Sequence, residues 1–172
     1  MEIITKGNDI TVIFDDGAKW LIDKEKLDKI GTEPKKDRIL NPYFATITVA
    51  DLPKLLFRDR AKLAKMPNIS DEMINALAND ESFFVRIVVA NRANLTDELK
   101  EKFANDCDTH VRFATASRSD LPSDLIAKLI TDKKPQVRCR IISHQKLTDE
   151  QIRYLKENDT DPQVQYLLEN IW

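Results

Sequence analysis

The segment Asn94-Leu95-Thr96-Asp97-Glu98 decides the fold, because closely similar segments begin 26 residues before it, 26 residues after it and 52 residues after it. Those three segments are Asn68-Ile69-Ser70-Asp71-Glu72, Asp120-Leu121-Pro122-Ser123-Asp124 and Lys146-Leu147-Thr148-Asp149-Glu150. A fixed period of about 20 to 50 residues is typical of solenoids, in which each repeat packs against its neighbours. The sequence therefore predicts a repeat array over most of the chain.

The same period continues inside each repeat. An aspartate is followed five residues later by a Val-Arg pair in three copies: Asp80 with Val85-Arg86, Asp106 with Val111-Arg112, and Asp132 with Val137-Arg138. The fourth copy has one extra residue and reads Val164-Gln165. We expect two helices per repeat, with Ser70, Thr96 or Thr148 as the N-cap of the first. Helices of about ten residues are unstable alone, so stacking must stabilise them.

The sequence of residues 95–116 resembles the variant leucine-rich repeats, which belong with the HEAT-like α-solenoids. The resemblance is carried by Leu-Thr-Asp-Glu-Leu, then Phe-Ala-Asn-Asp, then Val-Arg-Phe-Ala-Thr-Ala, and it extends over about residues 60–172. It implies a short right-handed α-solenoid that binds other macromolecules. Some members of that family carry an iron–sulfur segment with clustered cysteines. This chain has only Cys107 and Cys139, so we expect no cofactor.

The first 50 residues differ from the rest. Three segments rich in β-branched and aromatic residues are separated by turn sequences, which predicts a three-stranded meander. These segments are Glu2–Lys6, Ile10–Phe14 and Ala18–Ile22, and a short helix is expected over Asp23–Ile30. The predicted fold is therefore mainly α. It has a small N-terminal β-containing domain (1–50) and a repeat domain (51–172), made of a degenerate leading half-repeat (51–67) and repeats 68–93, 94–119, 120–145 and 146–172.

A periodic set of aspartates and arginines indicates a structural ladder. On a helical wheel Arg86 projects between apolar residues of the buried side, and a buried guanidinium requires a carboxylate partner. The partner can come from the same repeat or from a neighbouring one, and a phosphate-binding row of arginines is the alternative interpretation. The predicted ladder consists of Asp80, Arg86, Asp106, Arg112, Asp132 and Arg138.

The opposite face of the second helices is the candidate binding surface. Extending the same helical wheel places small polar residues in the middle of this face and cations at one edge, although an ordinary solvated face would look the same. The candidate partner-binding residues are Val88, Asn91, Arg92, Ser117, Arg118, Arg140, Ser143 and His144, together with Trp20 of the N-terminal domain.

Composition and motifs narrow the function. The 172 residues are 42% hydrophobic and 33% charged, and the net charge of −2 disfavours a protein that coats nucleic acid or an anionic membrane. No signal peptide or membrane-crossing segment is found, and two cysteines form no disulfide framework, which favours the reducing cytoplasm. His110 and His144 belong to no catalytic or metal-binding motif, and no glycine-rich phosphate loop exists. We therefore expect a protein that is not an enzyme and holds no metal.

The predicted function is protein binding, as an adaptor or an inhibitor of a larger protein assembly. The repeat surface, the β-containing domain or both would contact the protein partner, and the chain would be a monomer. The alternative is binding to a nucleic-acid backbone through Arg92, Arg118 and Arg140. Polar residues of the fourth repeat indicate a terminal cap that completes the array: Gln151, Lys156, Gln165 and Glu169.

Overall fold

The computed structural model describes residues 2–6, 9–13, 19–23 and 47–170, with side-chain surroundings for residues 47–170. The chain divides into two compact units, residues 1–48 and 49–172. The helix expected over Asp23–Ile30 lies outside the described residues.

The first unit contains three short strands. Strands β1 (Glu2–Lys6), β2 (Asp9–Ile13) and β3 (Lys19–Asp23) pair antiparallel in the order β1-β2-β3. The register pairs Ile4 with Thr11 and Val12 with Trp20. Trp20 thus lies in β3, and its side chain is outside the described part of the structure.

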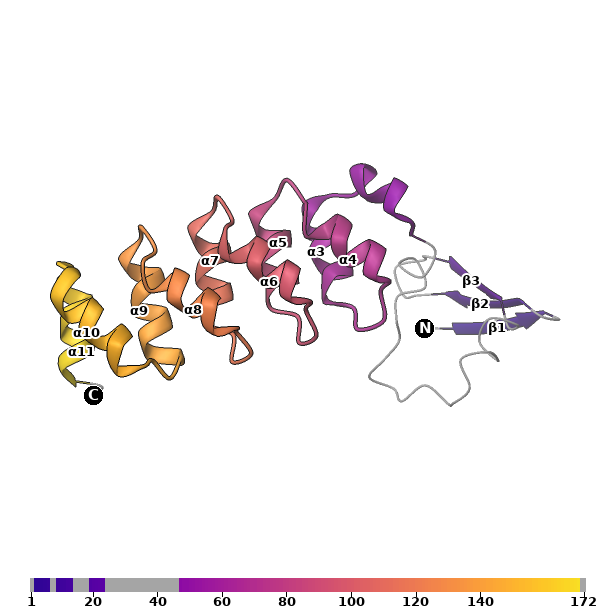
Figure 1. The fold of residues 1–172 in the computed structure, drawn as a ribbon. Helices are drawn as coiled ribbons and strands as arrows, with labels where there is room; N and C mark the ends of the chain where they lie inside the picture. Colours follow the sequence, from indigo (N-terminus) through magenta and orange to yellow (C-terminus); the bar gives the residue numbers. More distant parts are fainter. Residues whose placement is uncertain (1, 7–8, 14–18, 24–46, 171–172) are drawn as a thin grey trace. The chain divides into compact units, whose positions relative to one another are not determined.

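The second unit is helical throughout its described length (Figure 1). A 3-10 helix, η1 (Val49–Lys54), is followed by α3 (Phe57–Lys65), which corresponds to the second helix of a repeat. Four helix pairs follow: α4 (Asp71–Leu77) with α5 (Phe83–Ala90), α6 (Asp97–Ala104) with α7 (Thr109–Ala116), α8 (Ser123–Leu129) with α9 (Pro135–His144), and α10 (Asp149–Asn158) with α11 (Pro162–Asn170).

Hydroxyl side chains start three of the first helices. Ser70, Thr96 and Thr148 each accept a hydrogen bond from a backbone N–H three residues later. The side chain of Gln151 in turn accepts a hydrogen bond from the backbone N–H of Thr148, which completes a capping box. These bonds satisfy N–H groups that a helix leaves free at its N-terminus, so the periodic Ser and Thr positions determine where the helices begin.

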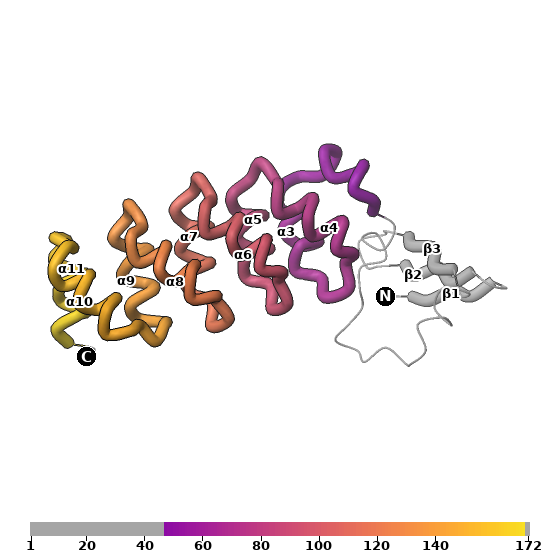
Figure 2. The backbone as a smooth tube through the Cα atoms, viewed as in Figure 1, coloured from indigo at the N-terminus to yellow at the C-terminus, as the bar shows by residue number. Residues whose placement is uncertain are grey.

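The second helices form one continuous row. Contacts run from α3 to α5, from α5 to α7, from α7 to α9 and from α9 to α11. The tube in Figure 2 shows the helix pairs following one another from α3 to α11. Each pair mainly contacts its neighbours along the chain, so the unit is a helical repeat array.

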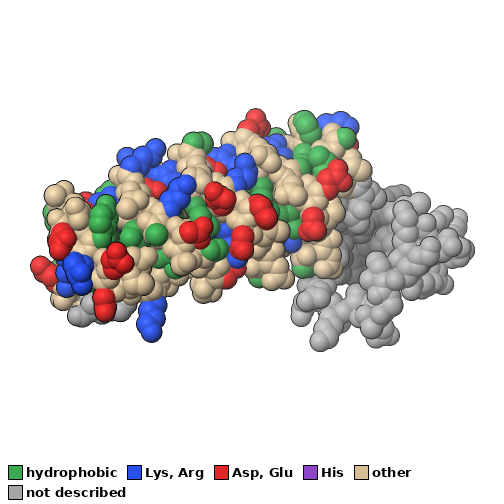
Figure 3. Space-filling view, viewed as in Figure 1, with side chains coloured by type: hydrophobic (Ala, Val, Ile, Leu, Met, Phe, Trp, Pro, Cys, Tyr) green, Lys and Arg blue, Asp and Glu red, His purple; other side chains and the backbone are tan. Residues whose placement is uncertain are grey.

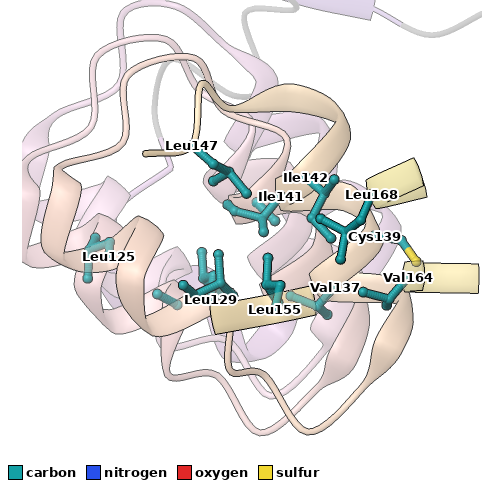
Figure 4. Packing of buried hydrophobic residues seen from close by; sticks show 13 residues of the cluster. Leu125, Leu129, Val137, Cys139, Ile141, Ile142, Leu147, Leu155, Val164 and Leu168 are labelled. Carbon is teal, nitrogen blue, oxygen red and sulfur yellow. The ribbon is translucent and has the colours of Figure 1, made fainter. Parts of the chain in front are cut away.

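The periodic apolar residues form the core of the array. Val85, Val111, Val137 and Val164 are all 0% exposed, and the anchors Leu77, Phe103, Leu129 and Leu155 are equally buried. Figure 4 shows a cluster formed mainly by the last two repeats, with Ala104 and Ala116 from the repeat before them, and in it Leu129 and Leu155 lie near Val137. Burial of about 25 cal/mol per Å² of apolar surface makes this shared core the main stabilising contribution.

The fourth repeat has polar residues where earlier repeats are apolar. Lys156 and Glu169 are exposed. The residues at the equivalent positions are buried: Ala78, Ala104 and Ile130 for Lys156, and Ala90, Ala116 and Ile142 for Glu169. The outward face of α10 and α11 is therefore hydrophilic at two positions that bury apolar contacts elsewhere in the array.

Candidate interaction surfaces

Arginine–aspartate ion pairs join successive repeats along the array. The Nε–Oδ2 distances are 2.6 Å for Arg60–Asp80, 2.7 Å for Arg86–Asp106, 2.6 Å for Arg112–Asp132 and 2.5 Å for Arg138–Asp159. In each pair the arginine belongs to one repeat and the aspartate to the next. Nη2 donates to Oδ1 as well, so every pair is bidentate. Asp159 and Arg60 extend this Asp–Arg ladder beyond the residues that the sequence analysis named.

Each ladder arginine also contacts its own repeat. Nη1 of Arg86 donates to the carbonyl of Asp80 at 2.8 Å, and Arg112 and Arg138 make the same bond to Asp106 and Asp132. One guanidinium therefore connects the turn of its own repeat to the turn of the next. Gln165 occupies the arginine position in the fourth repeat and still donates to the carbonyl of Asp159. Within residues 47–170, no carboxylate pairs with Gln165.

The ladder aspartates are buried acceptors with several donors. Oδ1 of Asp106 accepts the backbone N–H of Asp108 at 2.8 Å in addition to the Arg86 bonds. Burial acts to raise the pKa of Asp106, but the Arg86 hydrogen bond, the Asp108 N–H and the Arg86 charge outweigh it and hold this pKa below its ordinary value. The Asp106 hydrogen bond likewise raises the pKa of Arg86. Both groups are therefore charged at neutral pH.

The expectation that Arg92 and Arg118 face solvent on one ribbon is wrong for Arg118, which is buried. Nη1 of Arg118 donates to the carbonyls of Ala90 and Arg92 at 2.6 and 2.7 Å. Nη1 of Arg92 makes the corresponding bonds one repeat earlier, to Ala64 and Met66. Both arginines lie beyond the ends of α5 and α7, so the helical wheel does not apply to them. Each satisfies carbonyls at the C-terminus of the preceding second helix.

The third arginine of the predicted row is engaged as well. Nε of Arg140 donates to the Ser117 hydroxyl at 2.6 Å, and its guanidinium lies 4.6 Å from the centre of the Phe113 ring. The other candidate residues are divided between exposed and half-buried positions. Asn91, Ser143 and His144 are exposed, and Val88, Arg92, Ser117 and Arg140 are half-buried.

An exposed aromatic group that the sequence analysis missed lies at the start of the second helices. We call Leu56, Phe57, Phe83, Phe84 and His110 the aromatic edge. Leu56 is 72% exposed and Phe84 is 54% exposed. The ring centres are separated by 6.0 Å for Phe57–Phe84, 4.2 Å for Phe83–Phe84 and 5.7 Å for Phe83–His110, with interplanar angles of 28° to 29°. The rings thus stack across three successive repeats.

The fold does not require these aromatic residues. Phe83 and Phe84 begin α5, whereas the equivalent positions are Pro135 and Gln136 in α9, and Pro162 and Gln163 in α11. Proline suits the first position of a helix and glutamine is a good helix former, so a Pro-Gln start is structurally sufficient. The spacing of 26 residues between Phe57 and Phe83 is the sequence signal that could have identified the edge.

The charged side chains of the array are mixed in sign. Figure 3 shows Lys and Arg interspersed with Asp and Glu over the face in view, without a large area of one sign. Among residues 47–170, no group of three or more His, Cys, Asp or Glu side chains is arranged to hold a metal ion. No helix in the described part of the chain is long and apolar enough to cross a membrane.

These features define the protein as a helical repeat array. It has an Asp–Arg ladder, a second set of arginines that bind the carbonyls at helix C-termini, and an exposed aromatic edge. A scan against protein-family models gives no match, and comparisons with curated proteins and with solved structures also give none.

Proposed function

We propose that the chain is a protein-binding adaptor and that the aromatic edge is its contact surface. The observation that carries the proposal is the exposure of Phe84 at a helix start where the third and fourth repeats have glutamine. Exposed aromatic side chains are costly to leave in water and are enriched in the contact regions of protein interfaces. The repeat type is that of the HEAT-like and variant leucine-rich repeat solenoids.

The charges beside the aromatic edge favour a particular partner. Glu81 has a side chain that is 86% exposed, and its carboxylate lies 3.0 Å from Arg60. Because Arg60 already makes a bidentate pair with Asp80, the carboxylate of Glu81 is a negative charge in excess of that ion pair. Asp108 similarly lies beside His110, at 3.1 Å. Arg58 already places a guanidinium 5.8 Å from the centre of the Phe57 ring, so a partner segment with an apolar anchor would place a flanking Lys or Arg beside Glu81 and Asp108 and away from Phe57.

The N-terminal unit has a separate place in the proposal. As a small β-containing domain it would add a second contact and recruit the repeat array to a larger assembly. Two modest contacts joined in one chain bind far more tightly than either alone, which suits an adaptor or an inhibitor of an assembly.

The decisive experiment compares affinity capture by the full-length wild type and two variants. Phe84→Gln introduces the residue of the equivalent position, Gln136, and Tyr166→Gln removes an aromatic of similar exposure on α11. We expect a protein captured by the wild type and by Tyr166→Gln to be lost with Phe84→Gln, while all three proteins melt within a few degrees of each other. Equal capture by all three would contradict the proposal.

Binding to a nucleic-acid backbone is the weaker alternative. Arg118 uses its guanidinium donors on protein atoms, Nη1 of Arg92 donates to two carbonyls, and Nε of Arg140 donates to Ser117, so the three side chains do not form a row of free cations for phosphates. We expect affinities no better than the roughly 10⁻⁴ to 10⁻⁶ M of non-specific contacts at physiological salt. Fluorescence anisotropy with single- and double-stranded probes measures this, and nanomolar binding that is lost in an Arg92→Glu variant with an unchanged thermal melt would establish the alternative instead.

A further inference from the structure

Two equivalent arginines of the array differ in one partner. Arg92 and Arg118 both direct Nη1 to the carbonyls that end the preceding second helix. Arg118 also holds Asp120 with its other edge, because Nε donates to Oδ1 and Nη2 donates to Oδ2, both at 2.8 Å. The residue that stands two positions after Arg92 is Asn94. A neutral amide thus replaces the carboxylate in the earlier copy.

The edge of the Arg92 guanidinium formed by Nε and Nη2 consequently has no carboxylate partner among the described residues. Among the described residues, no carboxylate lies within ion-pair distance of Arg92 and its Nε donates no hydrogen bond. Nη2 makes one long bond, of 3.3 Å, to the carbonyl of Pro67. Burial lowers the pKa of Arg92, as expected for a guanidinium that leaves water without gaining an anion. A half-buried cation of this kind favours binding of an external negative group.

A pocket between the two copies contains this cation. It has a volume of about 370 Å³ and is lined by Asn91, Arg92, Ala93, Ser117, Arg118, Ser119 and Asp120. The carboxylate of Asp120 is matched by Arg118 at 2.8 Å and by Lys100 at 3.2 Å. The Arg92 charge is therefore not neutralised by the pocket, and the hydroxyl groups of Ser117 and Ser119 add polar atoms to its wall.

We propose that Arg92 forms a binding site for a carboxylate supplied by another molecule. The carboxylate lies in the plane of the guanidinium, with one oxygen on Nε and the other on Nη2, as the Asp120 carboxylate lies on Arg118. Planar bidentate pairing is the preferred geometry for Arg and carboxylate. An acidic side chain and a chain terminus of a partner present the same group. The site does not depend on the aromatic edge, so either can fail without the other.

The test observes the Arg92 Nε–Hε signal by ¹⁵N NMR in the full-length protein. Sodium acetate is titrated against sodium chloride at equal ionic strength, and the signal is assigned from its loss in Arg92→Lys. We expect a saturable shift with acetate and none with chloride. Absence of a saturable response to acetate, or an equal response to both salts, overturns the proposal. Saturation by inorganic phosphate without saturation by acetate also overturns the carboxylate assignment.

Three variants provide matched controls. Asn94→Asp places a carboxylate where Asp120 stands in the other copy, so acetate binding should weaken by about tenfold or more. Asn94→Ala leaves the edge open, and its affinity should stay near that of the wild type. Asp120→Asn should make the Arg118 signal respond to acetate as well. An Asn94→Asp protein that binds acetate like the wild type contradicts the proposed position of the site.

Two short peptides then separate the sources of the carboxylate. One carries an internal glutamate and an amidated C-terminus, and the other carries a free C-terminus and no acidic side chain. A saturable Arg92 response to either peptide, lost in Asn94→Asp, supports the site and identifies the source. Failure of both peptides to shift the signal overturns the role of the site in binding a partner.

Discussion

Arg138 pairs with Asp159 across 21 residues, whereas the other ladder pairs are separated by 20 residues. The extra residue lengthens α10, which ends at Asn158, and Asp159 keeps its position five residues before Val164. The array therefore accommodates an insertion in a first helix while the ion pair between repeats is retained. The contact, and not the residue count, defines the repeat boundary.

Removal of one ladder arginine should destabilise the protein strongly. Arg112→Ala leaves the Asp132 carboxylate, whose side chain is 7% exposed, without its cation and leaves the Asp106 carbonyl without a donor. We expect the free energy of unfolding to fall by about 3 to 5 kcal/mol. Urea denaturation measures the change, with exposed Arg153→Ala as a control that should stay within about 0.5 kcal/mol. A thermal melt of Arg112→Ala within a degree or two of the wild type would refute a structural role.

The contact made by Gln165 indicates which second substitution should restore stability when a ladder arginine is replaced by glutamine. A glutamine at this position still reaches the carbonyl of its own repeat, so the main defect of Arg112→Gln is the unpaired charge of Asp132. The double variant Arg112→Gln/Asp132→Asn removes that charge and should be more stable than Arg112→Gln alone by about 1 kcal/mol or more. A double variant that is less stable than the single variant would show that the carbonyl contact matters more than the ion pair.

The ladder should also make the free energy of unfolding depend on pH in the acidic range. Asp106 and Asp159 have pKa values below the ordinary 3.8, because bonds from Arg86 and Arg138 and from backbone N–H groups outweigh burial. Their contribution is complete above the unfolded-state value and is lost as the pH falls below about 3.8 through the lower folded-state values. The stability difference between wild type and Asp106→Asn should therefore shrink between pH 5 and pH 2. Urea titrations at several pH values test this, and a difference that stays constant would contradict it.

The polar outward face of the fourth repeat should prevent self-association. Lys156→Ile/Glu169→Ile restores the apolar character of the buried equivalents Ile130 and Ile142. The exposed apolar face should then promote dimers or larger species. Size-exclusion chromatography with light scattering measures the mass, and Tyr154→Ile, an already exposed aromatic position on α10, is the control. A double variant as monodisperse as the wild type would show that these two residues are not a cap.

The periodic pattern was sufficient to predict the helical repeats. The interval of 26 residues, with Ser70, Thr96 and Thr148 at the helix starts, places the elements because capping and apolar spacing are local properties. The origin of each ladder partner could not be predicted in the same way. An aspartate six residues before an arginine and one 20 residues after it are equally compatible with a 26-residue repeat, and only packing selects the latter.

The surface was harder to predict than the core. Arg92 and Arg118 follow the last turns of α5 and α7, where the chain leaves helical geometry, so a wheel places their side chains wrongly. Asp159 was missed because the extra residue displaces it from the 26-residue interval, at which Asn158 stands. Exposure of Phe84 has no local sequence signature. It becomes visible only when the equivalent positions are compared and Gln136 is found in its place.

The ladder also makes the two sides of each boundary between repeats chemically different. Opening any boundary between repeats leaves an arginine on the N-terminal side and an aspartate on the C-terminal side. A freed arginine has a long flexible stem and can carry its charge out to water. A freed aspartate is too short to do so and stays against the protein, where it keeps only the backbone N–H two residues later. Loss of the last repeat, which frees only Arg138, is therefore less costly than loss of α3, which strands Asp80. From the ladder contribution alone, we therefore expect local unfolding to begin at α10 and α11 in preference to α3.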